Sequence, residues 1–154
     1  GYFFNMYKGK CLLRKGGVMI IAHPLYDEFH PEHHPSYIEF FHRILPETRD
    51  SHVLQHKYEE SFAKDPAYIQ MYRHGNAYHG VHPFYMWYWG EAGRTHAGKV
   101  ICVGATNQRV AEILGWDTAA TIDEAIGAAR AFLQNTSPDI TLLHHPPILM
   151  AEVS

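Results

Sequence analysis

The sequence has little cysteine, no long apolar run and no excess of positive charge, and each shortage excludes a class of protein. Cysteine occurs only at Cys11 and Cys102 in 154 residues, without a CxxC pair, which excludes a disulfide-rich scaffold. We expect both cysteines to be reduced thiols in a cytoplasmic protein. No apolar run approaches the roughly 18 residues of a membrane-spanning helix. A net charge of −3 argues against binding to nucleic acid or to an anionic membrane.

Nucleotide-binding loops and linkers are also missing. The sequence has no P-loop, and the glycine of Val103–Asn107 lacks the spacing of a dinucleotide-binding loop. Without an internal repeat, low-complexity tract or linker, we expect residues 1–154 to form a single α/β domain. The chain begins Gly-Tyr-Phe-Phe and is core-like from its second residue, so we interpret it as a piece of a longer protein.

Apolar runs and amphipathic stretches indicate the secondary structure. The runs VMIIA, KVICV and DITLL are typical of strands buried on both faces. The helical period, together with capping residues, predicts helices between and around these runs. The expected strands are Val18–Ala22, Lys99–Val103 and Asp139–Leu143, and the expected helices are Tyr2–Lys15, Ser36–Leu45, Ser51–Lys64, Asp65–His74, His82–Gly98, Asn107–Leu114 and Thr121–Gln134.

This order of elements predicts an α/β fold. We expect a small, mostly parallel sheet of three to four strands covered by helices, with a helical insertion between the first two strands. The helix that starts at His82 carries an aromatic run, Phe84–Trp89, followed by small residues. Aromatic side chains dominate protein cores, so we interpret this helix mainly as core, with a site wall or a partner interface as the alternatives.

The sequence also contains 13 histidines, some of them at predicted strand ends. His23 follows the first strand, Gly104–Asn107 follows the second, and His144 and His145 follow the third. Binding sites of open parallel sheets form outside the carboxyl ends of the strands, which makes His23, Asn107, His144 and His145 candidates to face a ligand. The alternative is that these side chains contact loop backbone.

Three further histidines lie between two prolines. His30, His33 and His34 have Asp27, Glu28 and Glu32 nearby as oxygen donors. Imidazole and carboxylate ligands suit zinc, nickel or iron, so a divalent metal is one hypothesis for His30, His33 and His34. Their spacing matches no established zinc motif, and a solvated or packed loop is the alternative.

Four segments resemble the C-terminal region of proteins related to nickel-dependent lactate racemase, most closely uncharacterised, racemase-like members. The aromatic segment is the most specific of them, and the resemblance covers most of the chain from about Gly16 onward. The segments are FHPEHHPSY (Phe29–Tyr37), YHGVHPFYMWYWG (Tyr78–Gly90), GKVICVG (Gly98–Gly104) and LLHHPPILMAEV (Leu142–Val153).

The resemblance implies a two-domain isomerase with its active site between the domains. Such enzymes use a nickel pincer nucleotide, tethered to a lysine, that takes hydride from a 2-hydroxy acid and returns it to either face. The tethering lysine and the catalytic and nickel-binding histidines belong to the N-terminal domain, which would precede Gly1. We therefore expect this chain to be inactive alone, to hold no pincer cofactor by itself, and to need that domain or another subunit as partner.

The resemblance also suggests which residues face substrate or cofactor. At one place the sequence departs from the family pattern. His79, His82 and Trp87 of the aromatic segment are such candidates. The family pattern has a Gln and a Lys three apart after Asn-x-Tyr, whereas here Asn5-Met-Tyr7 is followed by Lys8-Gly-Lys10. The Gln is absent, Lys8 or Lys10 is a displaced equivalent, and the substrate need not be lactate.

Two other readings use the same residues without catalysis. The first is a non-catalytic, histidine-rich module that uses His30, His33 and His34 to hold a metal or to mediate assembly. The second is a structural domain whose aromatic helix packs on a partner.

Overall fold

In the computed structural model, which describes residues 11–143, two of the predicted apolar runs are adjacent parallel strands. Strand β1 (Val18–Ala22) pairs with β2 (Lys99–Val103), and β2 pairs in parallel with β3 (Asp117–Ala119). The strand order is β1-β2-β3. The predicted α/β fold, with a parallel sheet and a helical insertion between its first two strands, is confirmed.

The chain divides into two compact units. The sheet unit comprises residues 11–26 and 92–143 of the described chain, and the helical unit comprises residues 27–91. The helical unit is the insertion that the sequence predicts between the first two strands. Within residues 11–143, every helix is too short or too polar to cross a lipid bilayer.

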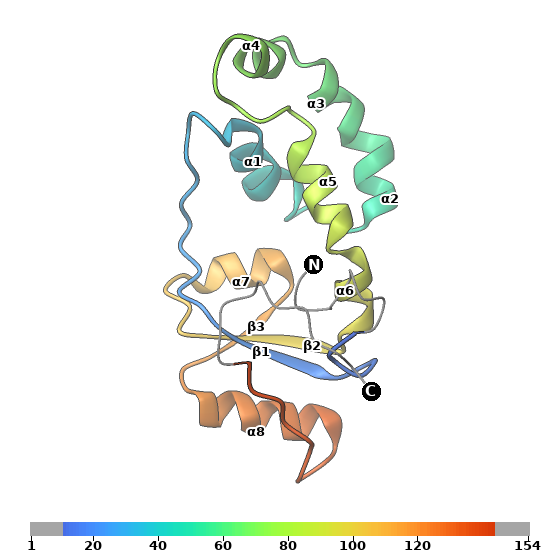
Figure 1. Ribbon diagram of the computed structural model, residues 1–154, viewed down its shortest axis with the longest axis vertical. Helices are drawn as coiled ribbons and strands as arrows, with labels where there is room; N and C mark the ends of the chain where they lie inside the picture. Colours follow the sequence, from blue (N-terminus) through green and yellow to red (C-terminus); the bar gives the residue numbers. More distant parts are fainter. Residues whose placement is uncertain (1–10, 144–154) are drawn as a thin grey trace. The chain divides into compact units, whose positions relative to one another are not determined.

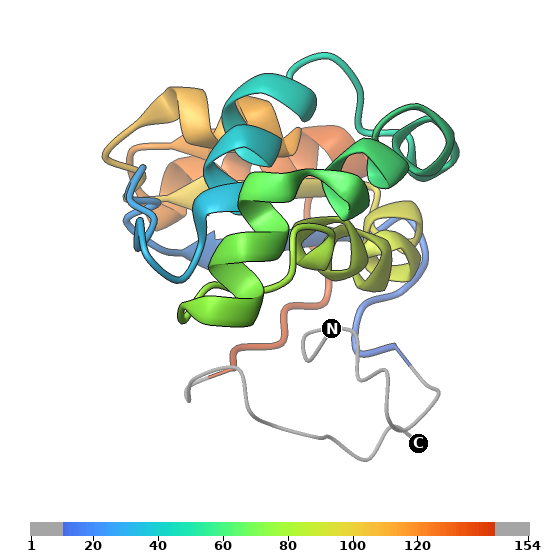
Figure 2. The ribbon, with the colours of Figure 1, turned by 90° about the horizontal axis from the view of Figure 1, so that it is seen from above.

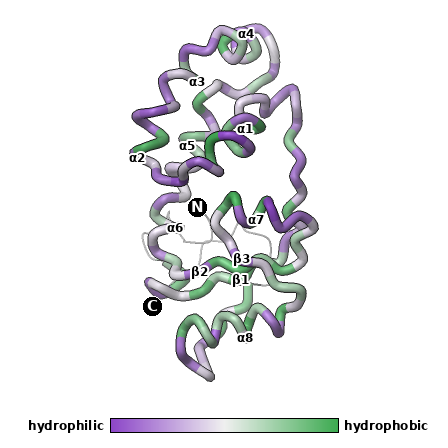
Figure 3. The backbone as a smooth tube through the Cα atoms, turned by 180° about the vertical axis from the view of Figure 1, so that it is seen from behind, coloured by the Kyte–Doolittle hydropathy of each residue, from purple (hydrophilic) through white to green (hydrophobic). Residues whose placement is uncertain are grey.

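Helices cover both faces of the sheet in the sheet unit. α7 (Gln108–Leu114) and α8 (Ile122–Leu133) lie on opposite faces, and α6 (Glu91–His96) precedes β2 (Figure 1). Ile101 and Cys102 are both buried, because neighbouring residues of a strand point to opposite faces. Ile101 packs against Ala125 and Ala129 of α8, whose small side chains allow close approach to the sheet. Figure 3 shows the apolar character of β1.

α7 and α8 of the sheet unit each begin after a residue whose side chain caps the helix. Asn107 accepts a hydrogen bond from the Arg109 backbone N–H at 3.1 Å and caps α7. Thr121 accepts one from the Glu124 backbone N–H at 3.1 Å and caps α8. Gly115, with φ 76°, ends α7 in the left-handed region that glycine tolerates.

The helical unit contains five α-helices and two π-helical turns in chain order. α5 contacts both α1 and α2 and lies between them in Figure 1, and Figure 2 gives the view from above. The elements are α1 (Pro35–Glu39), η3 (Phe40–Ile44), α2 (Ser51–Leu54), η4 (Gln55–Glu59), α3 (Glu60–Lys64), α4 (Pro66–His74) and α5 (His82–Trp89).

An aromatic cluster forms the core of the helical unit. Phe84 of α5 is 0% exposed, and its ring contacts Phe40 edge-on at a centroid distance of 4.6 Å and Phe62 at 4.9 Å. Gly80 allows the loop before α5 to reach α3, since a Cβ at this position would lie 2.5 Å from the Phe62 carbonyl oxygen. The aromatic helix is therefore core on the side that carries Phe84.

Two predicted elements are wrong where the structure describes them. Residues 11–15 of the predicted helix Tyr2–Lys15 are not helical, because a turn closed by the Gly17 N–H on the Arg14 carbonyl leads directly into β1. Residues 139–143 do not form the predicted strand Asp139–Leu143, and Leu142 is 76% exposed. The strand beside β2 is instead β3, a three-residue segment without an apolar run.

Candidate functional site

The carboxyl ends of β1 and β2 are joined by hydrogen bonds within the sheet unit. His23 follows β1, and its Nδ1 accepts a hydrogen bond from the Leu25 backbone N–H at 2.9 Å. Leu25 has φ 47°, so the ring of His23 supports a tight turn. The Thr106 backbone N–H and Oγ1 both donate to the Pro24 carbonyl, at 2.8 Å and 2.9 Å.

The candidates at these strand ends thus have local structural contacts. His23 contacts loop backbone, and the Asn107 side chain caps α7. Burial raises the pKa of the Cys102 thiol, which donates to the His23 carbonyl at 3.2 Å. The predicted candidates Lys8, Lys10, His144 and His145 lie outside the described residues.

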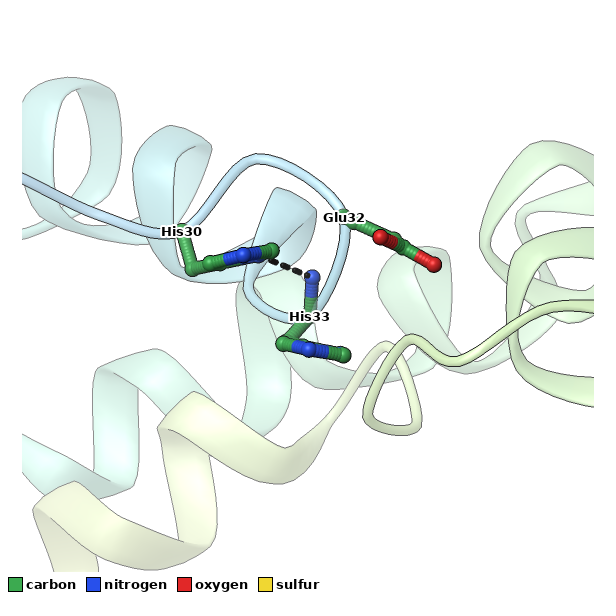
Figure 4. Close-up of side chains that lie close together, drawn as sticks. All are labelled: His30, Glu32 and His33. Atoms are coloured by element: carbon green, nitrogen blue, oxygen red, sulfur yellow. Dashed lines mark hydrogen bonds between the residues drawn. The ribbon is translucent and has the colours of Figure 1, made fainter.

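In the helical unit, His30, Glu32 and His33 lie close together. A ring nitrogen of each histidine and a carboxylate oxygen of Glu32 all lie within 4.8 Å of one another. The ring of His30 stacks on that of His33 at a centroid distance of 4.2 Å, as Figure 4 shows. They form the one group of three metal-ligating side chains found among residues 11–143.

Asn76 holds two members of this group. Its backbone carbonyl bonds with Nδ1 of His33 at 2.9 Å, and its side-chain Nδ2 donates to Oε1 of Glu32 at 2.7 Å. The hydrogen bond from Asn76 is the main cause that lowers the pKa of Glu32, and the nearby His33 and His30 also lower it. The Glu32 carboxylate is therefore ionised at neutral pH. The turn also contains a 3.3 Å hydrogen bond from the His33 N–H to Nδ1 of His30.

A second group of rings adjoins the same turn. The Tyr37 hydroxyl is hydrogen-bonded to Nδ1 of His82, and the Tyr78 ring stacks on the His82 ring at 4.6 Å. The His34 ring contacts Tyr37 at 5.1 Å and Tyr78 at 5.2 Å. We call His34, Tyr37, Tyr78 and His82 the His–Tyr cluster.

Burial sets the protonation states in this cluster. Burial, followed by the positive charges of nearby histidines, lowers the pKa of His34, so its ring is neutral at pH 7. Burial raises the pKa of Tyr37 to about 12, so its phenol keeps its proton. The protonated phenol of Tyr37 can donate its hydrogen to Nδ1 of His82. The cluster thus brings imidazole and phenol groups side by side.

Two other predicted residues lie elsewhere in the helical unit. The His79 ring contacts Tyr72 edge-on at 5.0 Å, and its Nδ1 accepts a 3.3 Å hydrogen bond from the Val81 N–H. Trp87 is buried, and its Nε1–H donates to the Arg49 carbonyl at 3.1 Å. Trp89 is 62% exposed, so the aromatic helix has a buried face and an open one.

The structure thus brings His30 and His33 together with Glu32, and His34 together with His82. Sequence reasoning missed Asn76, Tyr37 and Tyr78 as site residues. From the sequence, Asn76 was interpreted as a helix terminator and Tyr37 as a core residue. Their contacts with His33 and His82 span more than 40 residues, and no local sequence pattern predicts such contacts. Tyr78 lies at the start of a histidine-rich segment, and this position was the sequence feature that could have identified it as a site residue.

Comparisons with protein-family models, with curated proteins and with solved structures found no match to this chain.

Proposed function

We propose that this chain is the C-terminal α/β domain of a racemase-like enzyme that acts on a 2-hydroxy acid. The observation that supports the proposal is the meeting of two segments that carry the family resemblance. The Tyr78 N–H donates to the His33 carbonyl at 2.9 Å, and Tyr37 bonds to His82. The His–Tyr cluster at this junction consists of imidazoles and phenols, which supply proton donors and acceptors rather than apolar contact alone.

A 2-hydroxy acid offers a carboxylate and a hydroxyl group for recognition. Imidazole N–H and phenol O–H groups donate to such oxygens, and a neutral imidazole nitrogen accepts from a hydroxyl. In the proposed enzyme, the His–Tyr cluster orients the substrate. The nickel pincer nucleotide, when bound, supplies the hydride chemistry at the 2-carbon.

The pincer cofactor is assigned to other parts of the enzyme. The resemblance places its tethering lysine and its nickel-binding histidine in a preceding domain, so no residue among 11–143 is given a role in holding it. Lys8 or Lys10 remains the proposed displaced equivalent of the family lysine. The chain alone is accordingly proposed to be inactive, with that domain or another subunit as its partner.

The test uses the full-length gene product charged with the cofactor. Chiral chromatography should show interconversion of the enantiomers of a 2-hydroxy acid, tried across lactate and larger analogues. Hydride transfer and return should retain deuterium at C2 in ordinary water, whereas proton abstraction would exchange it. A full-length product without histidines and a lysine able to hold the cofactor would refute the proposal.

Variants of the cluster test its role within that enzyme. Tyr37→Phe removes the hydroxyl that bonds His82 and should lower turnover at least tenfold, the lower range for losing a positioned acid–base contact. Tyr85→Phe is the matched control, because Tyr85 is half-exposed and its hydroxyl bonds Glu59 rather than the cluster. Equal activity in the two variants would remove the cluster from the reaction.

The second candidate is a structural domain whose aromatic helix packs on a partner, favoured by the exposure of Trp89. A full-length protein that shows no turnover, together with loss of a defined oligomer in Trp89→Ala, would favour this candidate. Size-exclusion chromatography with light scattering measures that outcome.

A further inference from the structure

The turn at His30–His33 presents nitrogen and oxygen ligands in forms that suit a metal ion. A carbonyl oxygen can only accept a hydrogen bond, so the 2.9 Å contact with the Asn76 carbonyl requires the proton of His33 on Nδ1. In the neutral form of the ring, this places the free lone pair on Nε2 of His33. Protein metal sites use this same arrangement, in which a histidine donates its second ring N–H to a carbonyl and ligates through the other nitrogen.

The carboxylate of Glu32 is also oriented by Asn76. The Asn76 side chain donates to Oε1 at 2.7 Å and fixes the carboxylate, while Oε2 is left for a further ligand. One residue from a distant loop thus orients two of the three donor groups, through its backbone carbonyl and its side-chain amide.

The distances require a modest closure. Zinc binds imidazole nitrogen and carboxylate oxygen at about 2.0–2.2 Å, which places the donors of a tetrahedral site roughly 3.3 Å apart. The donors here lie within 4.8 Å of one another. His30 and Glu32 are exposed and His33 is half-buried, so side-chain rotation can bring the donors together without moving the core. Rotation of His30 would break its 3.3 Å contact with the His33 N–H and change the stacking of its ring on that of His33.

We propose that His30, Glu32 and His33 bind one divalent transition-metal ion of the zinc class, with Asn76 as the supporting residue. Two imidazoles and one carboxylate suit zinc and its neighbours, whereas calcium and magnesium prefer oxygen ligands alone. Three protein ligands leave the fourth position of a tetrahedral zinc to water or to an external ligand. This site goes beyond the proposed racemase-like function, whose nickel belongs to a preceding domain.

The experiment titrates the metal-free chain with Zn²⁺ by calorimetry, after chelator treatment and removal of the chelator. The wild-type chain should bind one equivalent, and an excess of Mg²⁺ should not compete. His33→Asn should abolish this binding while retaining the fold, because an asparagine amide can replace the Nδ1–H donor but not the Nε2 ligand. Glu32→Gln keeps an acceptor for Asn76 but loses the charge, and should weaken binding at least tenfold.

Two further variants distinguish ligation from structural support. Asn76→Ala keeps the backbone carbonyl and removes the contact to Glu32, so it should weaken binding by about tenfold, the lower range for such supporting residues. His52→Ala is the matched control, since His52 and His56 line a separate surface depression and are spaced as an alternative histidine pair. Circular dichroism checks the fold of every variant.

The outcomes are distinct. One equivalent of Zn²⁺ that is lost in His33→Asn and retained in His52→Ala supports the site. Binding that is unchanged in His33→Asn, or lost in His52→Ala, overturns it, as does a wild-type chain without stoichiometric binding. None of these results depends on racemase activity, so the two proposals fail separately.

Discussion

The Phe84→Leu substitution tests whether the aromatic helix serves as core in the helical unit. Phe84 is 0% exposed and makes two edge-on ring contacts, with Phe40 and with Phe62. Each such pair contributes about 0.5–1.5 kcal/mol beyond burial, so the loss of both predicts a cost of roughly 1–3 kcal/mol. Leucine retains most of the apolar contact, and the variant should still fold.

Urea unfolding monitored by tryptophan fluorescence measures this cost, because two of the three tryptophans, Trp87 and Trp89, lie in α5. Met86→Leu is the matched control, since Met86 is 45% exposed in the same helix and the swap conserves volume. It should change the free energy of unfolding by less than about 0.5 kcal/mol. A Phe84→Leu cost no larger than that of Met86→Leu would refute the packing argument.

The same substitution has a consequence for the His–Tyr cluster. α5 begins at His82, two residues before Phe84, so loosened packing of the helix should disturb the Tyr37–His82 hydrogen bond. The NMR signals of the His82 ring should shift in Phe84→Leu and remain in place in Met86→Leu. Unchanged His82 signals in both variants would show that the His–Tyr cluster does not depend on the packing of Phe84.

Three other predictions concern single groups. The Ser36 hydroxyl is buried and has no hydrogen-bond partner in the described part of the chain, so Ser36→Ala should leave the unfolding free energy unchanged or raise it by about 1 kcal/mol; a comparable loss measured in urea would contradict this. Burial raises the pKa of Cys102, so less of it is thiolate at pH 8 than for an ordinary thiol, and peptide mapping should find it alkylated more slowly than the half-buried Cys11. Equal rates in the folded chain would refute the burial of Cys102. Thr121→Ala removes the cap on the Glu124 N–H and should cost about 1 kcal/mol in urea unfolding, whereas Thr121→Ser should cost little; equal losses would contradict the cap.

Much of the fold could be predicted from the sequence because the signals were local. The runs Val18–Ala22 and Lys99–Val103 are the observed β1 and β2, since strands buried on both faces need continuous apolar residues. The Thr121 cap predicted α8, and Asp65-Pro66 predicted the start of α4. The predicted helix start at His82 likewise matches the start of α5.

The third strand was predicted wrongly, because its position depends on which segment pairs with β2. DITLL has the composition of a strand, yet residues 139–143 have no strand structure, and β3 takes the place beside β2. β3 contains an aspartate, a threonine and an alanine, so its pattern gave no strand signal. Which segment pairs with β2 is decided by chain connections and packing, not by composition.

The sequence alone determined which residues offered chemistry: the histidines near Pro31 and Pro35, and those around the aromatic helix. It did not determine which of them meet. His33 reaches Asn76, and Tyr37 reaches His82, across more than 40 residues, so these contacts exist only when the helices of the inserted unit have packed together. The tertiary structure thereby separated His30 and His33, with Glu32, from His34 and His82, because contact and burial depend on the neighbours that folding supplies.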